Sequence, residues 1–260
     1  IRELIVKRGR VDFKLLALSF ERPPRQMMEI IGSLVMIGVI VYCVEVTGLG
    51  TKMSMAMIDW AGGNIYLLLF FTMLASLILG LALPSIACYI FLAVLAAPAL
   101  VGAGILPLAA HMFVFYFGVV SGITPPVGTP FFVAAGIAGA DPMKTGWQAM
   151  KLGIAGYVSP FMFALSPTIL LQGGSPLLIV RDCVSLMVAA FGLACAVEGY
   201  CFRRIGVLRR VLFGVAGCML VVPDMVTDAI GYALLALLVV LEVLAWKRSR
   251  AMEAGADHPT

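Results

Sequence analysis

The stretch from Gly80 to Gly128 reads GLALPSIACYIFLAVLAAPALVGAGILPLAAHMFVFYFGVVSGITPPVG and decides how this chain folds. It is apolar enough for a membrane interior, yet proline and glycine interrupt it repeatedly. The two sharpest breaks, at 80–85 and 121–128, combine these helix breakers with serine and threonine. Non-helical backbone is tolerated at membrane depth only where protein buries it or where it lines a polar cavity. Paired interruptions of this kind indicate the binding site of a secondary transporter.

The composition of the whole chain predicts an all-α polytopic membrane protein. Of 260 residues, 62% are hydrophobic and 12% are charged, with a mean hydropathy of +1.06. Soluble proteins carry about a quarter charged residues. The net charge of +4 does not indicate a nucleic-acid partner, because the basic residues form short clusters between apolar spans, as positive-inside anchors do. The six cysteines include no CxxC pair, so we interpret them as packing residues and expect no metal site.

The order of polar and apolar segments predicts four regions. A basic arm at the cytoplasmic face or interface (1–27) precedes a repeat with a re-entrant hairpin and a broken helix (28–171). A C-terminal extension with three apolar spans (172–250) and a disordered tail (251–260) follow.

Within the repeat, the hairpin is predicted near 64–101 and the discontinuous helix near 108–139. A first span is predicted at 28–48, a polar loop at 50–63 and a polar connection at 141–151. Arginines near 203–210 and the basic residues after Trp246 place those loops on the cytoplasmic side. Asp224 and Asp228 flank Pro223, where we expect a solvated turn.

The residue types at the two breaks suit a sodium ion. Sodium prefers oxygen ligands, and helix ends inside a membrane offer free carbonyls. Hydroxyls, prolines that free carbonyls and glycines that allow close turns supply the candidate site: Gly80, Pro84, Ser85, Ser121, Gly122, Thr124, Pro125 and Gly128. No aspartate, glutamate, lysine or arginine lies between Gly80 and Gly139. The alternative is that these residues are ordinary kinks and packing points of membrane helices.

His111 is a candidate pocket residue. A histidine inside an apolar segment is either a protonation or solute contact, or a packed side chain bonded to a neighbour. The sequence leaves both interpretations open.

These motifs resemble the fused membrane permease of TRAP (tripartite ATP-independent periplasmic) transporters, in particular its C-terminal portion and the branch that works with TAXI-type binding proteins. The matching stretches lie between 28 and 171 and include LILGLALPSIACY (77–89), PLAAHMFVFYFGVVSGITPPVG (107–128), AAGIAGADPMKTGWQA (134–149) and SPFMFALSPTILL (159–171). The family's hairpin tip usually reads close to GMGLPTTAAY. Here Ala82 replaces its second glycine and Ile86 its second threonine, which removes one hydroxyl.

The resemblance implies half of an inverted-repeat elevator transporter in the bacterial inner membrane, with no cofactor and with sodium as the coupling ion. It also implies an organic anion, of the carboxylate type, delivered by a periplasmic solute-binding protein. The remaining partners would be the N-terminal permease half or a small membrane subunit, and the lipid bilayer. We expect these 260 residues alone not to transport solute.

Two other classes of function compete with this interpretation. The altered hairpin tip also fits a non-transporting membrane scaffold or a degenerate remnant of a permease. An intramembrane enzyme would need convergent catalytic groups, and the sequence contains no HExxH or GxSxG motif and no paired intramembrane acids, so we predict that the protein is not an enzyme.

Overall fold

The structure is a computed structural model that describes residues 6–7, 10–11, 31–32, 35–81 and 83–256, of which 6–7, 10–11, 129 and 248–256 are described by their backbone alone. The chain divides into two units, Ile1–Leu49 and Gly50–Thr260. In the first unit, strand β1 (Val6–Lys7) pairs antiparallel with β2 (Arg10–Val11), and Val35–Thr47 is helical. Most of the predicted basic arm lies outside the described residues.

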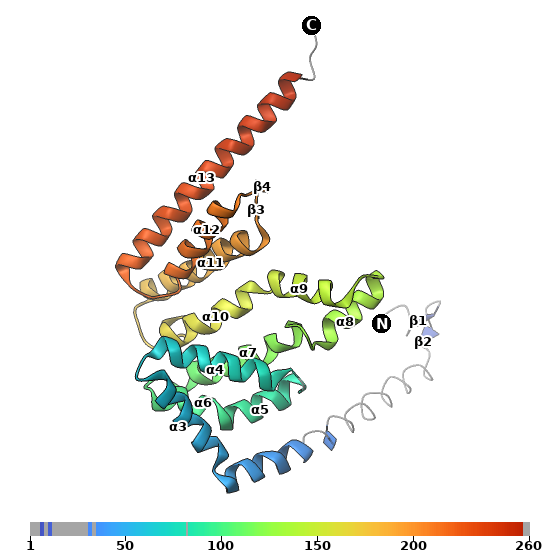
Figure 1. Ribbon diagram of the computed structural model, residues 1–260, viewed down its shortest axis with the longest axis vertical. Helices are drawn as coiled ribbons and strands as arrows, with labels where there is room; N and C mark the ends of the chain where they lie inside the picture. Colours follow the sequence, from blue (N-terminus) through green and yellow to red (C-terminus); the bar gives the residue numbers. More distant parts are fainter. Residues whose placement is uncertain (1–5, 8–9, 12–30, 33–34, 82, 257–260) are drawn as a thin grey trace. The chain divides into compact units, whose positions relative to one another are not determined.

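The second unit begins with five helices that enclose a hydrophobic core. They are α3 (Leu49–Ala61), α4 (Ile65–Gly80), α5 (Ser85–Leu95), α6 (Ala97–Gly102) and α7 (Pro107–Val120). Helices α4, α5 and α6 all pack against α7, as Figure 1 shows. Phe113 and Phe117 of α7 are fully buried in this core, with their rings 4.9 Å apart. Helix α7 is therefore the central element around which the breaks are arranged.

The predicted polar loop at 50–63 is wrong, because most of this segment forms α3. Gly50, Ser54, Met57 and Ala61 are buried along one face of that helix. The hydroxyl of Ser54 donates to the carbonyl oxygen of Leu95 at 3.2 Å, so the polar side chain is satisfied inside the protein. Polar and small residues here mark a close helix contact.

Three shorter helices follow the second break: α8 (Thr129–Ala138), α9 (Pro142–Leu152) and α10 (Ile154–Leu165), the last continued by a 3-10 turn, η2 (Pro167–Leu170). Gly139 ends α8 with φ 63°, which suits glycine. The Asp141 side chain caps α9 by accepting from the Lys144 amide at 2.8 Å. The polar connection predicted at 141–151 is therefore largely a capped helix.

The C-terminal part has a hydrophobic core of its own. Helix α11 (Pro176–Glu198) is followed by a tight hairpin of β3 (Tyr200–Cys201) and β4 (Arg203–Arg204), then by α12 (Val207–Met219) and α13 (Met225–Ala256). Phe213, Ala216 and Leu220 are fully buried among these helices. Helix α13 is drawn through Ala256 and so includes the first residues of the tail predicted at 251–260, while the remainder of that tail lies outside the described residues.

Three helical segments among the described residues are long and apolar enough to cross a membrane: Ser85–Gly102, Pro176–Glu198 and Met225–Lys247. Helix α12, with 13 residues, is not one of them. The described strands are only two residues long each. The predicted all-α polytopic membrane fold is confirmed.

Candidate functional site

The first break separates α4 from α5. Helix α4 begins at the cap Asn64, whose side chain accepts from the Tyr66 amide at 2.9 Å, and it ends at Gly80. Pro84 then sits at the N-cap of α5 without any side-chain cap. Proline has no N–H group and disfavours helix in the preceding residue, so the chain cannot continue straight from α4 into α5. Ala82, at the tip of this break, lies outside the described residues.

The second break separates α7 from α8. Helix α7 ends at Val120, a 3-10 turn covers Ser121–Ile123, and α8 starts after Gly128. An added Cβ at Gly128 would overlap the carbonyl oxygen of Gly122. The φ of Gly128 is −177°, which any residue can adopt, so the backbone conformation does not require glycine. Glycine is required here because a side chain would have no space.

The two breaks touch each other. A Cβ added to Gly80 would lie 2.8 Å from the Cβ of Ser121 and even nearer to its hydroxyl. Ser121 is fully buried, and its hydroxyl donates to the Gly118 carbonyl at 2.6 Å. The end of α4 therefore packs directly on the start of the second break.

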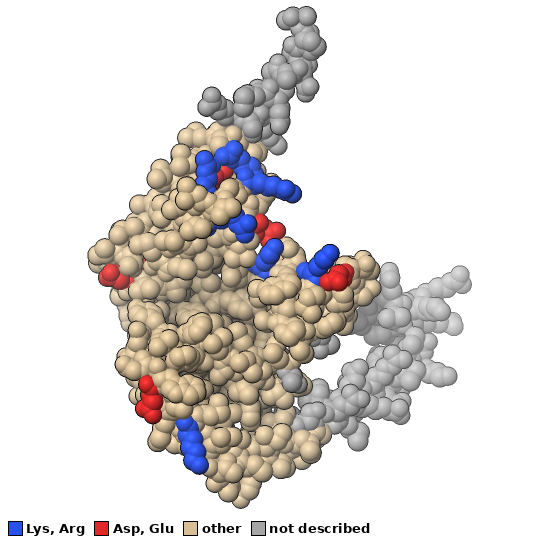
Figure 2. All heavy atoms as spheres, viewed as in Figure 1, with Lys and Arg blue, Asp and Glu red and all other residues tan. Residues whose placement is uncertain are grey.

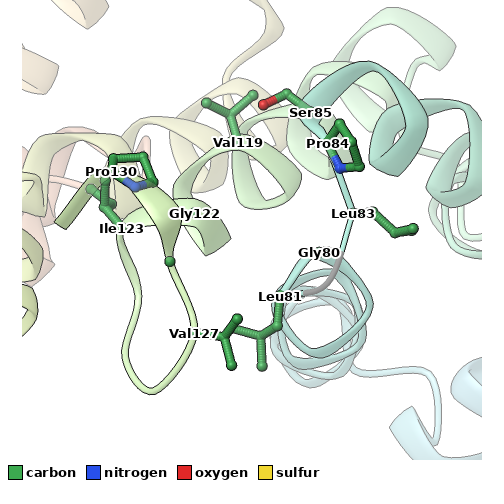
Figure 3. A pocket seen from close by; sticks show the side chains of 11 residues that line it. Gly80, Leu81, Leu83, Pro84, Ser85, Val119, Gly122, Ile123, Val127 and Pro130 are labelled. Carbon is green, nitrogen blue, oxygen red and sulfur yellow. The ribbon is translucent and has the colours of Figure 1, made fainter. Parts of the chain in front are cut away.

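One cavity of about 600 Å³ lies between the breaks and is lined by Gly80, Leu81, Leu83, Pro84, Ser85, Val119, Gly122, Ile123, Val127, Gly128 and Pro130. Figure 3 shows the Leu81 and Val127 side chains pointing toward one another, while the Ser85 hydroxyl points toward Val119. The cavity thus joins segments that are about 40 residues apart in the sequence.

Five of the eight candidate residues at the breaks line this cavity: Gly80, Pro84, Ser85, Gly122 and Gly128. Ser121, Thr124 and Pro125 are not among its lining residues. The Thr124 hydroxyl is 2.9 Å from the Val120 carbonyl and 2.6 Å from the Tyr157 hydroxyl of α10. Its hydrogen bonds therefore fix the broken segment against α10.

His111 lies outside the cavity lining. It is half-buried on α7, and its Nδ1 is 3.3 Å from the Tyr89 hydroxyl of α5. The two rings meet edge to face with centroids 6.1 Å apart. Of the two interpretations left open by the sequence, the geometry is that of a packed histidine bonded to a neighbour.

The electrostatics of the cavity come from helix ends. Helices α5 and α8 begin at it, and α4 and the 3-10 turn after α7 end at it. The N-terminal end of a helix carries partial positive charge and the C-terminal end partial negative charge. None of the lining residues that the structure describes is acidic or basic, and among these Ser85 alone has a side-chain oxygen. The cavity can therefore offer favourable positions to an anion and to a cation without any fixed charge.

Sequence reasoning missed two buried acids in the C-terminal part, Asp182 and Glu242. Asp182 accepts from the hydroxyls of Ser166 and Thr168, and from Arg181 at 2.9 Å. Glu242 is fully buried and binds Arg203, at 2.7 Å, and Arg209. A single acid in an apolar span is itself a signal for a specific partner.

The expectation that Asp228 is solvated is also wrong. Asp228 is only 6% exposed and lies 3.8 Å from Arg181, while its second carboxylate oxygen has no hydrogen-bond partner among the described residues. Asp228 is buried because α13 starts directly after the turn at Pro223 and packs on α12.

Membrane-length helices, two broken segments and an uncharged cavity between the breaks define a multi-pass membrane protein of the transporter class. The family model described as tripartite ATP-independent periplasmic transporter, DctM component, matches residues 3–178, and the chain belongs to this family. The family provides the large membrane permease of transporters that work with a periplasmic binding protein and a small membrane subunit, and it is not a family of enzymes. No curated protein and no solved structure matches the chain.

The match ends at the third residue of α11, so most of α11 and all of α12 and α13 lie beyond it. The hydrogen bonds from Ser166 and Thr168 to Asp182 join the matched part to the C-terminal part. At the C-terminal end of α11, Glu198 accepts from Gln148 of α9 at 3.2 Å. These polar contacts connect the two parts at both ends of α11.

Proposed function

We propose that this permease takes up an organic anion of the carboxylate type together with sodium, and that the cavity between the two breaks is the shared site. The observation that carries the proposal is the uncharged cavity at which two helices begin and two helical segments end. Discontinuous helices of transporters use the same division of charge, with N-terminal ends facing anionic groups and C-terminal ends facing the coupling cation.

The oxygen atoms near the cavity that could act as ligands support a sodium ion in particular. A sodium ion needs several oxygen ligands, and the Ser85 hydroxyl together with carbonyls at the ends of α4 and the 3-10 turn are of that kind. Ser121 and Thr124 act in this proposal by holding the broken backbone, since their hydroxyls already donate to the Gly118 and Val120 carbonyls. Sodium is the coupling ion in this proposal.

The finer features of the family resemblance belong to the same proposal. The solute would reach the permease from a periplasmic binding protein of the TAXI type, in the bacterial inner membrane. The hairpin near 64–101 and the broken helix near 108–139 would form the mobile half-site of an elevator, with the other half supplied by the N-terminal permease repeat. The breaks' direct contact, Gly80 on Ser121, supports their movement as one piece.

The test is sodium-driven uptake by the complete transporter in proteoliposomes, with its small subunit and binding protein present. Ser85→Ala removes a side-chain oxygen that lines the cavity and should weaken apparent sodium affinity about tenfold or more, as expected for a lost contact to a charged species. The matched control is Ser159→Ala, because that hydroxyl donates to Ala155 within α10 and lies outside the cavity.

An unchanged sodium affinity in Ser85→Ala would place the ion elsewhere. Uptake that proceeds equally without a sodium gradient would exclude sodium coupling. A complete transporter that inserts stably and moves no solute would favour the scaffold or remnant alternative.

A further inference from the structure

The hairpin of β3 and β4 lies where two membrane-length helices end. The apolar span of α11 ends at Glu198, directly before the hairpin, and that of α13 ends at Lys247. Two contacts bring α13 to the hairpin: Arg203 binds Glu242 at 2.7 Å, and the Phe202 and Trp246 rings lie 6.3 Å apart. Tyrosine and tryptophan near span ends are typical of the membrane–water interface. Both membrane-length segments therefore end beside this hairpin, where the headgroup region of a bilayer would begin.

Positive charge exceeds negative charge at this hairpin. Four arginines (Arg203, Arg204, Arg209, Arg210) face two glutamates (Glu198, Glu242). Glu242 forms ion pairs with Arg203 and Arg209. Arg210 donates through Nε to the Ala196 carbonyl and through Nη2 to the Val197 carbonyl, each at 2.9 Å. Arg204 is exposed, and no acid among the described residues pairs with it. In Figure 2, basic side chains gather over the hairpin and the start of α12.

A pocket of about 600 Å³ opens at this point, lined by Glu198, Gly199, Tyr200, Arg204, Ile205 and Arg210. Gly199 ends α11 with φ 72°, and a Cβ there would lie 3.1 Å from the Arg210 guanidinium. The glycine thus lets Arg210 lie across the end of α11. Two guanidinium groups line one hollow, and only Arg210 has its donors partly occupied.

We propose that this pocket binds the phosphate of an anionic phospholipid headgroup, such as phosphatidylglycerol. Guanidinium groups present planar pairs of donors that match phosphate oxygens. Basic pockets at the ends of membrane helices bind anionic headgroups, and the positive-inside rule assigns this end to the cytoplasmic leaflet. Next to the pocket, α12 exposes Val207, Leu208 and Val211, which provide an apolar surface for the acyl chains.

Glu198 is the one acidic residue in the pocket and lowers its positive potential. Both of its carboxylate oxygens lie 3.2 Å from Gln148 Nε2, which draws the carboxylate toward α9. Neutralising it should therefore strengthen binding of an anion, whereas neutralising Arg204 should weaken it. Opposite effects of two substitutions in one pocket distinguish a site from a general charge effect.

The experiment measures lipid retained by the full-length protein, purified from nanodiscs of mixed phosphatidylcholine and phosphatidylglycerol and weighed by native mass spectrometry. Arg204→Ala should reduce the amount of retained phosphatidylglycerol about fivefold, since a basic residue near an anionic surface strengthens binding by about that factor. Arg204→Lys should keep part of it, and Glu198→Gln should increase it. The control is Lys52→Ala, which removes an exposed charge on α3, outside the pocket.

Size-exclusion profiles verify that each variant is folded, and none of these readouts depends on transport. Equal losses in Arg204→Ala and Lys52→Ala would overturn the proposal in favour of general surface charge. An unchanged retention in Arg204→Ala would overturn it outright. If inorganic phosphate binds with the same dependence on Arg204 while phosphatidylglycerol is not retained, the ligand is a free anion and the lipid assignment is wrong.

Discussion

Replacing Gly80 by alanine tests the contact on which the cavity depends. The new Cβ would lie 2.8 Å from the Ser121 Cβ, nearer still to its hydroxyl, and 3.1 Å from Cys88 Sγ. Relieving this overlap requires a shift of roughly 1 Å, and overpacking of this size costs about 1–3 kcal/mol. The higher helix propensity of alanine returns at most about 1 kcal/mol, and less at the last residue of a helix. We expect a net loss of about 1–2 kcal/mol.

The double variant with Ser121→Gly isolates the contact, since it removes both obstructing atoms of that side chain. Ser121→Gly alone should cost about 1–2 kcal/mol through the lost hydrogen bond to Gly118 and the added backbone entropy. If the breaks touch, the double variant should be more stable than the sum of the single changes by about 1–2 kcal/mol. The assay is equilibrium unfolding in mixed micelles, followed by far-ultraviolet circular dichroism.

The matched control is Gly136→Ala on α8, where an added Cβ has nothing within 4 Å. It should leave stability unchanged or raise it by up to about 1 kcal/mol. Additivity of Gly80→Ala and Ser121→Gly within about 0.5 kcal/mol would refute direct contact between the breaks. A loss in Gly136→Ala as large as that in Gly80→Ala would show that glycine is needed for a reason other than space.

Four further substitutions use the same unfolding assay. Gly128→Ala should cost more than Gly80→Ala, about 3 kcal/mol or above, because the obstructing Gly122 carbonyl is backbone and cannot rotate away. Glu242→Ala should cost about 2 kcal/mol, below the usual range for a broken buried pair, because both arginine partners are 40% exposed and reach water. Asp182→Asn should cost about 2–3 kcal/mol, because three side chains donate to this carboxylate. Asp228→Asn should cost less than about 1 kcal/mol, because one of its carboxylate oxygens has no partner among the described residues. Equal losses at the two aspartates, or no loss in Glu242→Ala, would contradict the respective networks.

The breaks were predictable because proline and glycine act locally. Pro84 restricts its own φ and the residue before it, whatever the rest of the chain does, so the end of α4 could be placed from sequence. Their convergence on one cavity followed from the pairing of interruptions seen in transporters. The structure adds the distinction between Ser85, which lines the cavity, and Ser121, which is buried beside it. That distinction depends on side-chain direction, which spacing alone does not give.

The errors arose where a polar residue was interpreted by its type alone. Gly50, Ser54, Met57 and Ala61 recur at helical spacing, yet the small residues among them and the nearby charges suggested a loop. The pattern was present and is typical of helices in close contact. Asp182 is a different case, because its donors come from a turn 14 to 16 residues earlier, and only the tertiary fold brings them together.

The two hydrophobic cores have a consequence for the order in which the protein is made. The core around α7 draws on residues between Met53 and Leu170, and the second core on residues between Val188 and Val239. The ribosome therefore releases every part of the first core before α11 is complete, and a domain that emerges early folds early. If the first core forms before the span that carries Asp182 is inserted, the hydroxyls of Ser166 and Thr168 would already be in place to donate to its carboxylate, which would lower the cost of inserting that charge.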